Sequence, residues 1–293
     1  MSDREGILDV PGGRVWYRSL GDDGVPILML HGGPGFPSDY MEALAGLAAN
    51  RRVIFYDQLG CGRSPAPDDP ALWTLERFMD ELDAVRDGLG LEQVHLLGSS
   101  WGGMLAMQYV LDRDRPPVSL ITAGSPASSP RWNQMAAQLL SELDPSDLAE
   151  IERVEAAGIV EGPELDAAVR PFYIRHVCRM DPWPDGLLRA DATANRAMYR
   201  YMAGPSEFRI VGTLRDWDIM DRLGEIAVPT LVTGGEFDEC RPEHLQEVHE
   251  RIPGSELRVI PNASHLCFAE RTDIYIPLVE DFLDRVEAAA GIG

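Results

Sequence analysis

Short hydrophobic runs alternate with helix-like stretches through the first part of the chain. Four runs have the length and apolar content of buried strands, at residues 26–30, 52–56, 94–97 and 118–123. Between them, residues 38–49 and 74–89 carry the apolar spacing of amphipathic helices, and Thr74 is a suitable N-cap for the second. Residues 7–10 and 15–17 predict an N-terminal β-hairpin. Alternating strands and helices predict an α/β fold with a mostly parallel sheet and helices on both faces.

The alternation stops after residue 126 and resumes near residue 221. The stretch between contains no convincing strand and instead predicts helices, at 132–143, 145–157, 163–178 and 191–203. After this stretch, the sequence predicts a strand at 230–233, a helix at 242–252, a strand at 256–260 and a closing helix at 274–289. We therefore expect an α/β core built from residues 1–126 and 221–293. Residues 127–220 are expected to be a helical cap, inserted over the carboxyl edge of the sheet.

The composition is that of an ordinary globular protein with a strong negative charge. Lys and Arg total 26 against 48 Asp and Glu, which gives a formal net charge of −22. This charge repels nucleic acid and anionic membranes, so neither is expected as a partner, and it mildly favours a cationic substrate. No apolar run approaches the ~20 residues of a membrane span, and no apolar segment follows the N-terminal residues. A cytoplasmic protein without a signal peptide is therefore expected.

The four cysteines are scattered along the chain, without the spacing of a metal site. We therefore expect free thiols, no metal ligands and no cofactor.

The first candidate chemistry lies where the strand at 94–97 ends. Gly98, Ser100 and Gly102 form a Gly-x-Ser-x-Gly pattern there, followed by a helix-like run at 104–111. A serine at such a strand–turn–helix junction is exposed at the tip of the turn, which is the arrangement of a nucleophile elbow. The pattern alone is weak evidence, because Gly and Ser are also common in ordinary turns.

A nucleophilic serine needs a base, and the base needs a carboxylate that orients it. In folds with a nucleophile elbow, the acid and the base follow the serine in chain order, behind later strands of the sheet. Asp238 follows the strand at 230–233, and His265 is the only one of the six histidines that follows the strand at 256–260. Ser100, Asp238 and His265 are therefore the predicted catalytic triad.

A glycine-rich loop, His31-Gly32-Gly33-Pro34-Gly35, directly follows the strand at 26–30. Three glycines and a proline in five residues cannot extend the strand or begin a helix, so the loop exposes backbone N–H groups. In hydrolases with a nucleophile elbow, one N–H of such a loop and the N–H behind the serine form an oxyanion hole. Gly33 and Trp101 are therefore the predicted oxyanion donors.

Together these motifs resemble the proline iminopeptidase family, serine peptidases of the α/β-hydrolase fold that remove the N-terminal residue of a peptide. The resemblance covers nearly the whole chain. It rests on the glycine loop at 31–35, Asp57-Gln58-x-Gly60-x-Gly62-x-Ser64, Gly98-x-Ser100-Trp101-Gly102-Gly103, Gly235-Glu236-x-Asp238-Glu239 and the His265 loop. It implies an α/β-hydrolase core under a helical cap and an acyl-enzyme mechanism that uses the triad.

The resemblance also implies how the substrate amine is held. An aminopeptidase must bind a free α-ammonium beside the scissile carbonyl, and a buried cation needs carboxylate partners. The family resemblance assigns this role to Glu207 and Glu239. Glu239 directly follows Asp238 and so must lie near the site, whereas Glu207 is placed by the resemblance alone. Glu236 is a third candidate, although a loop carboxylate of this kind is better suited to capping nearby N–H groups.

Two motifs differ from those of prolyl-specific members, which read Asp-Gln-Arg-Gly-Ser-Gly and Gly-Gly-Ser-Trp-Gly-Ser. Here Leu59 and Cys61 stand in the first motif, and Ser99 and Gly103 in the second. These residues are similar to a branch of broader specificity that includes the tricorn-interacting aminopeptidase and amino-acid amidases. We therefore expect an aminopeptidase that releases Pro or another, often hydrophobic, N-terminal residue from short peptides. The alternatives are an amino-acid amidase or a carboxylesterase on the same scaffold and, more remotely, a ligand receptor without catalysis.

Overall fold

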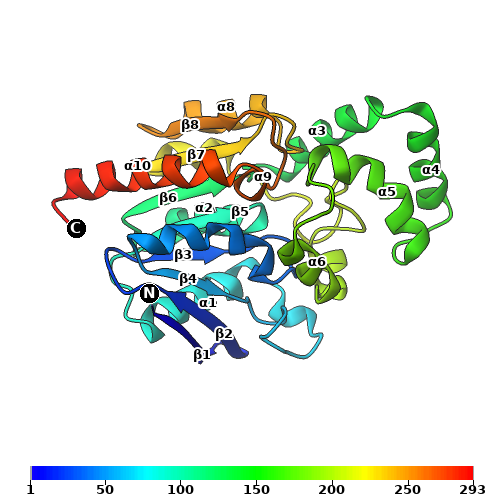
Figure 1. Cartoon of the computed structure of the whole chain (residues 1–293). Helices are drawn as coiled ribbons and strands as arrows, with labels where there is room; N and C mark the ends of the chain where they lie inside the picture. Colours follow the sequence, from blue (N-terminus) through cyan, green and yellow to red (C-terminus); the bar gives the residue numbers. More distant parts are fainter. Residues whose placement is uncertain (1, 293) are drawn as a thin grey trace.

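A single mixed sheet forms the centre of the protein in the computed structural model, which describes residues 2–292 (Figure 1). Within these residues its order is β1-β2-β4-β3-β5-β6-β7-β8. The strands are β1 (Asp3–Val10), β2 (Gly13–Leu20), β3 (Ile27–Leu30), β4 (Val53–Tyr56), β5 (His95–Ser99), β6 (Ser119–Ala123), β7 (Thr230–Gly235) and β8 (Glu256–Ile260). The pairs β1–β2 and β2–β4 are antiparallel, and the other neighbours are parallel. The predicted α/β fold and its N-terminal hairpin are confirmed.

Helices cover both faces of the sheet, and each face has its own hydrophobic core. One core packs α1 (Leu75–Gly88), α2 (Trp101–Asp112) and α8 (Pro242–Arg251) against the sheet. The other packs η1 (Ser38–Ala49), α9 (Cys267–Glu270) and α10 (Thr272–Ala290) against the opposite face. Successive strand residues supply the two cores in turn, as in β3, where Leu28 belongs to the first core and Met29 to the second. The central strands are fully buried on both faces for this reason.

The helix predicted at 38–49 is present, but it is a 3₁₀ helix rather than an α-helix. Its buried side chains include Met41, Leu44 and Leu47, which recur at every third residue. A 3₁₀ helix has three residues per turn, so this spacing aligns all three in one row, whereas an α-helix would displace each by about 60° from the one before. The short α9, just behind the predicted His265 loop, was not predicted.

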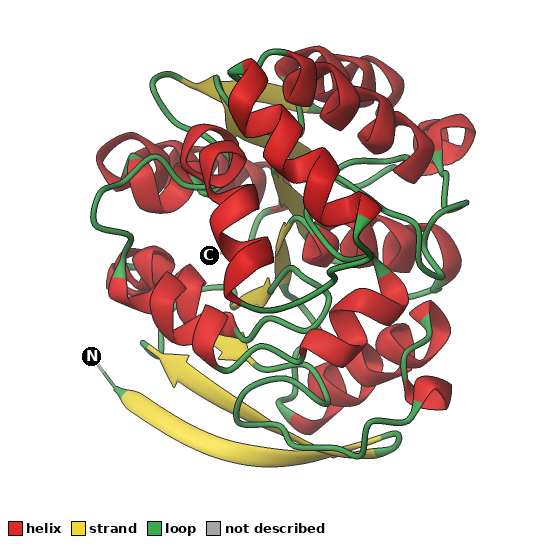
Figure 2. Cartoon of the chain, turned by 90° about the vertical axis from the view of Figure 1, so that its right-hand side faces the viewer, coloured by secondary structure: helices red, strands yellow, loops and turns green. Residues whose placement is uncertain are grey.

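Between β6 and β7 the described chain contains helices and loops but no strand. The helices are α3 (Ser129–Ser141), α4 (Pro145–Ala156), α5 (Pro163–His176), α6 (Asp185–Ala192), α7 (Arg196–Met202) and η3 (Met220–Glu225). Helices α3, α4, α5 and α6 lie at one end of the sheet, the end at which β5, β6 and β7 finish (Figure 1), and this end faces the viewer in Figure 2. Part of this segment packs closely on the core, since a Cβ added at Gly186 in α6 would lie 2.5 Å from the carbonyl oxygen of Asp39 in η1.

The helix predicted at 191–203 is present as α7 but begins later, because residues 191–192 are the end of a separate helix, α6, that was not predicted. Asn195 separates them. Its side chain accepts a hydrogen bond from the N–H of Met198 at 2.9 Å, which starts a new helix. Its backbone N–H donates to the carbonyl of Gly35, and its side-chain amide donates to the carbonyl of Gly60. The break therefore ties this segment to two loops of the core.

None of the described helices combines the length and the apolar composition that crossing a membrane requires. Residues 2–292 also hold no group of three or more His, Cys, Asp or Glu side chains placed to bind a metal ion.

A buried ion pair attaches the C-terminal helix to the sheet. The guanidinium of Arg51 donates two hydrogen bonds to Glu287 in α10, at 2.9 and 3.0 Å. Glu287 also accepts a hydrogen bond from His95 Nε2 in β5 at 3.0 Å. Arg51 and Glu287 are 3% and 8% exposed, so neither charge is compensated by water. Arg51 also donates to Asp284 at 2.5 Å, but the Asp284 side chain is exposed, so removing Glu287 would leave the buried guanidinium with only a surface partner.

We expect Glu287→Ala to lower the free energy of unfolding by about 3 kcal/mol, measured by urea denaturation, because Arg51 loses its bidentate partner. Glu280→Ala is the matched control. Glu280 lies on the same helix but accepts only a surface hydrogen bond from Asn50, so its loss should change stability by less than about 0.5 kcal/mol. Equal losses in the two variants would contradict this role for the Arg51–Glu287 pair.

Candidate active site

Ser100 lies at a sharp turn between β5 and α2. Its backbone has φ 55° and ψ −122°, a conformation that residues other than glycine rarely adopt. The turn is tight because glycines flank it. A Cβ added at Gly98 would lie 2.4 Å from the carbonyl oxygen of Gly102, and one added at Gly102 would lie 1.9 Å from that of Leu30. Strand and helix can therefore approach this closely only with glycine at both positions, which is the geometry of a nucleophile elbow.

His265 and Asp238 meet at the ends of the last two parallel strands. Asp238 Oδ1 lies 2.8 Å from His265 Nδ1 and also accepts the N–H of Cys240 at 2.8 Å. Asp238 Oδ2 accepts the N–H of Gly235 at 3.2 Å. Asp238 is 1% exposed and His265 5%. The carboxylate is thus fixed by the backbone and is oriented to hold His265 with its proton on Nδ1 and with Nε2 facing away.

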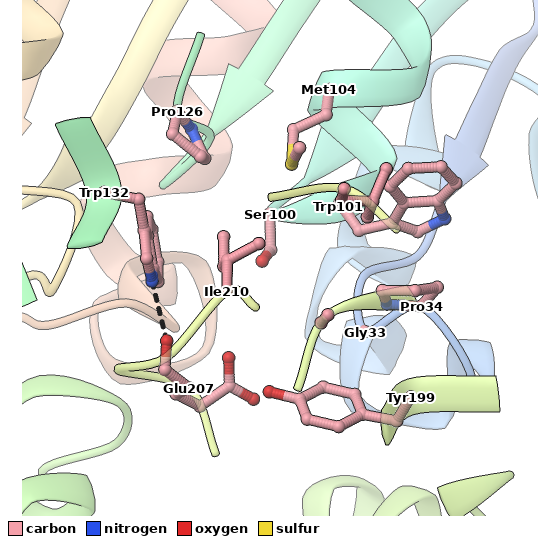
Figure 3. A pocket seen from close by; sticks show the side chains of 12 residues that line it. Gly33, Pro34, Ser100, Trp101, Met104, Pro126, Trp132, Tyr199, Glu207 and Ile210 are labelled. Carbon is pink, nitrogen blue, oxygen red and sulfur yellow. Dashed lines mark hydrogen bonds between the residues drawn. The ribbon is translucent and has the colours of Figure 1, made fainter. Parts of the chain in front are cut away.

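Ser100 and His265 line one cavity of about 50 Å³, together with Gly33, Phe36, Tyr40 and Glu207. No hydrogen bond joins the Ser100 hydroxyl to His265 among the described residues. Such contacts are often long in free enzymes and shorten when the substrate is bound. A second cavity of about 20 Å³ lies on the other side of Ser100, lined by apolar side chains that include Met104, Trp132 and Ile210 (Figure 3).

Gly33 and Trp101 each present a backbone N–H beside Ser100. Both residues line the smaller cavity with Ser100, and Gly33 also lines the larger one. Trp101 is the first residue of α2, where an N–H has no partner within the helix. Neither N–H makes a hydrogen bond to another group in residues 2–292. The neighbouring N–H of Gly32, in contrast, donates to the Tyr40 hydroxyl at 2.6 Å. Two donors therefore remain free beside the serine.

Glu239 is buried without a partner. It is 1% exposed, and neither carboxylate oxygen has a hydrogen-bond partner. The group that can carry an opposite charge beside it is His265, whose Nε2 lies 3.8 Å from Glu239 Oε1. An isolated buried carboxylate is costly, because desolvation favours its neutral form. Burial raises the pKa of Glu239 well above its ordinary value, and the carboxylates of Glu207 and Asp238 raise it further against the opposing effect of His265.

Glu207 reaches the same region from the segment between α7 and η3. Its carboxylate faces the Ser100 cavity, and the Tyr199 hydroxyl points toward it (Figure 3). Two aromatic side chains hold its backbone: Trp132 Nε1 donates to the Glu207 carbonyl at 2.6 Å, and the Glu207 N–H donates to the Tyr173 hydroxyl at 3.3 Å. Burial raises the pKa of Glu207, while His265 and Tyr199 lower it. Glu207 and Glu239 thus surround His265 with negative charge.

These carboxylates change the basicity of His265. Burial by itself lowers the pKa of the imidazole, but Asp238, Glu239 and Glu207 outweigh burial and raise that pKa to about 10. The free site therefore keeps a proton on His265 at neutral pH. A cation that enters between Glu207 and Glu239 would compensate the carboxylates, lower the pKa of His265 and release the imidazole to act as a base.

The structure thus brings together every residue that the sequence predicts for this site, namely Ser100, His265, Asp238, Gly33, Trp101, Glu207 and Glu239. The third carboxylate candidate, Glu236, is exposed and accepts the N–H of Asn262 at 2.9 Å, so it caps a loop.

Sequence reasoning missed the aromatic side chains around the carboxylates. Trp132, Tyr173 and Tyr199 lie in predicted helices, where aromatic residues usually serve packing. The only indication in the sequence is that Tyr and Trp side chains each carry a polar atom, which needs a hydrogen-bond partner when the side chain is buried. Gln58 is a buried residue behind the site. It belongs to the motif at 57–64, but the sequence indicates no role for its side chain.

This arrangement supplies the parts of an acyl-transfer enzyme. Ser100 is the candidate nucleophile, His265 the candidate base, and Gly33 and Trp101 the candidate oxyanion donors.

Comparisons with known proteins agree with this geometry. A family model described as the alpha/beta hydrolase fold matches residues 25–159. The proline iminopeptidase of Heyndrickxia coagulans is 38% identical over 286 residues, which cover 96% of this chain and 99% of that protein. Among solved structures, VinJ superposes with a TM-score of 0.93 at 35% identity, covering 97% of this chain and 99% of VinJ. The proline iminopeptidase of Mycobacterium smegmatis superposes with a TM-score of 0.87 at 37% identity. The match covers 99% of this chain and 100% of that protein.

We expect Glu239→Gln to lower the pKa of His265 by roughly one unit or more, because the variant removes a negative charge beside Nε2. An NMR titration of the imidazole resonances measures this shift, and the His265→Gln variant identifies the resonance. Glu236→Gln removes a carboxylate three residues away at the surface and should leave the titration unchanged. An unchanged His265 titration in Glu239→Gln would show that Glu239 does not control its basicity.

Proposed function

Since the chain belongs to the proline iminopeptidase family of α/β-hydrolases, it is a serine aminopeptidase, and we propose how its residues divide the reaction. Ser100 attacks the carbonyl carbon of the N-terminal residue while His265 Nε2 takes the hydroxyl proton. The negative oxygen of the tetrahedral intermediate receives the N–H groups of Gly33 and Trp101. His265 then gives its proton to the leaving amine, which departs as the C–N bond breaks, and water hydrolyses the acyl-enzyme by the same steps.

The observation that supports a free-amine substrate best is the buried, unpartnered Glu239. Both of its oxygens lack a hydrogen bond, and they lie beside His265, which lines the larger cavity together with Glu207. An α-ammonium bound between the two carboxylates supplies the missing donors and a positive charge that remains when His265 gives up its proton. It also lowers the pKa of His265, which that environment raises to about 10, so substrate binding itself prepares the base. An ester or amide without an amine offers neither effect, and this favours the aminopeptidase over a carboxylesterase.

The two cavities beside Ser100 suggest where the rest of the substrate lies. His265 lines the larger cavity and must reach the leaving amine, so the chain beyond the scissile bond lies on that side. The smaller cavity has an apolar lining that includes Met104, Trp132, Ile210 and Leu214, and it receives the side chain of the first residue.

The remaining functional assignments are proposals of the same kind. Leu59, Cys61, Ser99 and Gly103 favour the branch of broader specificity, in which proline is one accepted residue among several and amino-acid amides are also substrates. Residues 127–220 act as a cap that contributes Glu207 and closes the site against water. The physiological substrates are short peptides in the cytoplasm.

Replacing Ser100 with Ala should lower kcat for L-prolyl-p-nitroanilide by roughly 10⁶, because the acyl-enzyme can no longer form. Labelling by a fluorophosphonate probe should disappear in the same variant. Substantial turnover by a pure sample of Ser100→Ala would remove Ser100 from the mechanism.

Glu239→Gln and Glu207→Gln should each reduce kcat/KM for aminoacyl anilides by an amount equivalent to roughly 2–5 kcal/mol, since each removes a charge that pairs with the ammonium. Hydrolysis of p-nitrophenyl acetate, which has no amine, should fall much less, and Glu236→Gln should affect neither substrate. Equal losses on both substrates in the Glu239 and Glu207 variants would rule out amine recognition by these residues.

A further inference from the structure

Gln58 connects the two backbone segments that carry the oxyanion donors, although its side chain reaches neither cavity. It lies two residues beyond the end of β4 and is fully buried, at 0% exposure. Its Oε1 accepts the indole N–H of Trp101 at 3.0 Å, and its Nε2 donates to the carbonyl of His31 at 2.9 Å. An indole N–H can only donate and a carbonyl can only accept, so the two partners fix which way the amide points.

His31 is held by the same residue and passes that constraint to Gly33. The backbone N–H of Gln58 donates to His31 Nε2 at 2.8 Å, so Nε2 is an acceptor and the ring proton is on Nδ1. Nδ1 lies 3.1 Å from the carbonyl oxygen of Gly32 and donates to it. Burial lowers the pKa of His31, which keeps the ring neutral in this tautomer.

The Gly32 carbonyl and the Gly33 N–H belong to one planar peptide unit. Fixing the carbonyl of that unit therefore fixes the direction of its N–H. The N–H of Gly32 itself is already used by the Tyr40 hydroxyl, so the loop offers Gly33 alone. On the other side of Ser100, the Trp101 indole is turned away from the serine hydroxyl (Figure 3). There it bonds to Gln58, while the backbone N–H of the same residue faces the smaller cavity.

We propose that Gln58 is a positioning residue that aligns the Gly33 and Trp101 donors toward one point, and hence sets how strongly the site stabilises a tetrahedral oxyanion. It touches no substrate, so it acts only through His31 and Trp101. The proposal rests on the oxyanion assignment in the proposed function. Donors of this kind contribute when their direction is set before the reaction, because no reorganisation is then needed as charge develops.

Gln58→Met tests this role, because methionine fills a similar volume but makes neither hydrogen bond. We expect kcat for L-prolyl-p-nitroanilide to fall by roughly 10², with KM changed by less than about twofold. Two inhibitors separate the oxyanion from ground-state binding. Pyrrolidine-2-boronic acid forms a tetrahedral adduct with the serine, and prolinol carries the amine and ring alone. Affinity for the boronic acid should fall by the same factor as kcat/KM, and affinity for prolinol should not change.

Gln108→Met is the matched control. Gln108 is a buried glutamine in α2 whose Oε1 accepts the indole N–H of Trp217 at 2.8 Å, and it lines neither cavity. The Gln108→Met substitution makes the same chemical change at a residue that does not contact the oxyanion donors. We therefore expect kcat and both inhibitor affinities to stay at wild-type values. Thermal unfolding of each variant shows whether it is folded at the assay temperature.

Trp101→Phe provides an independent test should Gln58→Met fail to fold, since it removes only the indole N–H and keeps the ring and the backbone donor. We expect roughly a tenfold loss of kcat and of boronic acid affinity, again with prolinol unaffected. Equal weakening of both inhibitors, or no weakening of either, in a folded variant would overturn the role of Gln58. A wild-type protein that binds neither inhibitor and cleaves no aminoacyl anilide would instead overturn the proposed function.

Discussion

Glu239 places a carboxylate 3.8 Å from the imidazole of His265 in a region closed to water, and neither of its oxygens has a hydrogen-bond donor. Leaving a buried carboxylate in this state costs free energy, and the protein tolerates the cost because the surrounding fold holds the group in place. Asp238, the preceding residue, is fixed by two backbone N–H groups and by His265, so Glu239 cannot turn away without disrupting that arrangement. We propose that a cation of the substrate supplies the missing hydrogen-bond donors.

The fold explains how these groups converge. Parallel strands end at one edge of the sheet, so Ser100, Asp238 and His265 are brought together from positions 165 residues apart in the chain. The core alone supplies the nucleophile, the base and the oxyanion donors. Glu207 comes from the helical segment between β6 and β7, whose position depends on packed contacts such as those of Asn195 and Trp132. The candidate carboxylates for substrate binding thus come from both parts of the chain, Glu239 from the core and Glu207 from the segment between β6 and β7.

Local signals in the sequence were sufficient for the core. The strand runs, the Thr74 cap and the glycine pattern at the elbow each reflect interactions within a few residues, and the order of the triad follows from the parallel sheet. The 3₁₀ geometry of η1 was missed although its buried residues recur at every third position, a spacing that helices of both kinds tolerate. The break at Asn195 was missed because it depends on the distant partners Gly35 and Gly60. Glu207 is similar: no local pattern separates it from an exposed carboxylate, and only the family resemblance indicated its role. The link through Gln58 depends on side-chain directions that no spacing rule encodes.

The central claim is that a buried pair of carboxylates makes a free amine necessary for catalysis. The most direct measurement compares kcat/KM of the wild-type enzyme for L-prolyl-p-nitroanilide and for cyclopentanecarboxylic acid p-nitroanilide. The two substrates have the same ring size and leaving group and differ only in the ring nitrogen. The account predicts that the carbocyclic substrate is cleaved roughly 10³-fold less efficiently, because it leaves Glu239 unpartnered. A difference of less than about tenfold would contradict it.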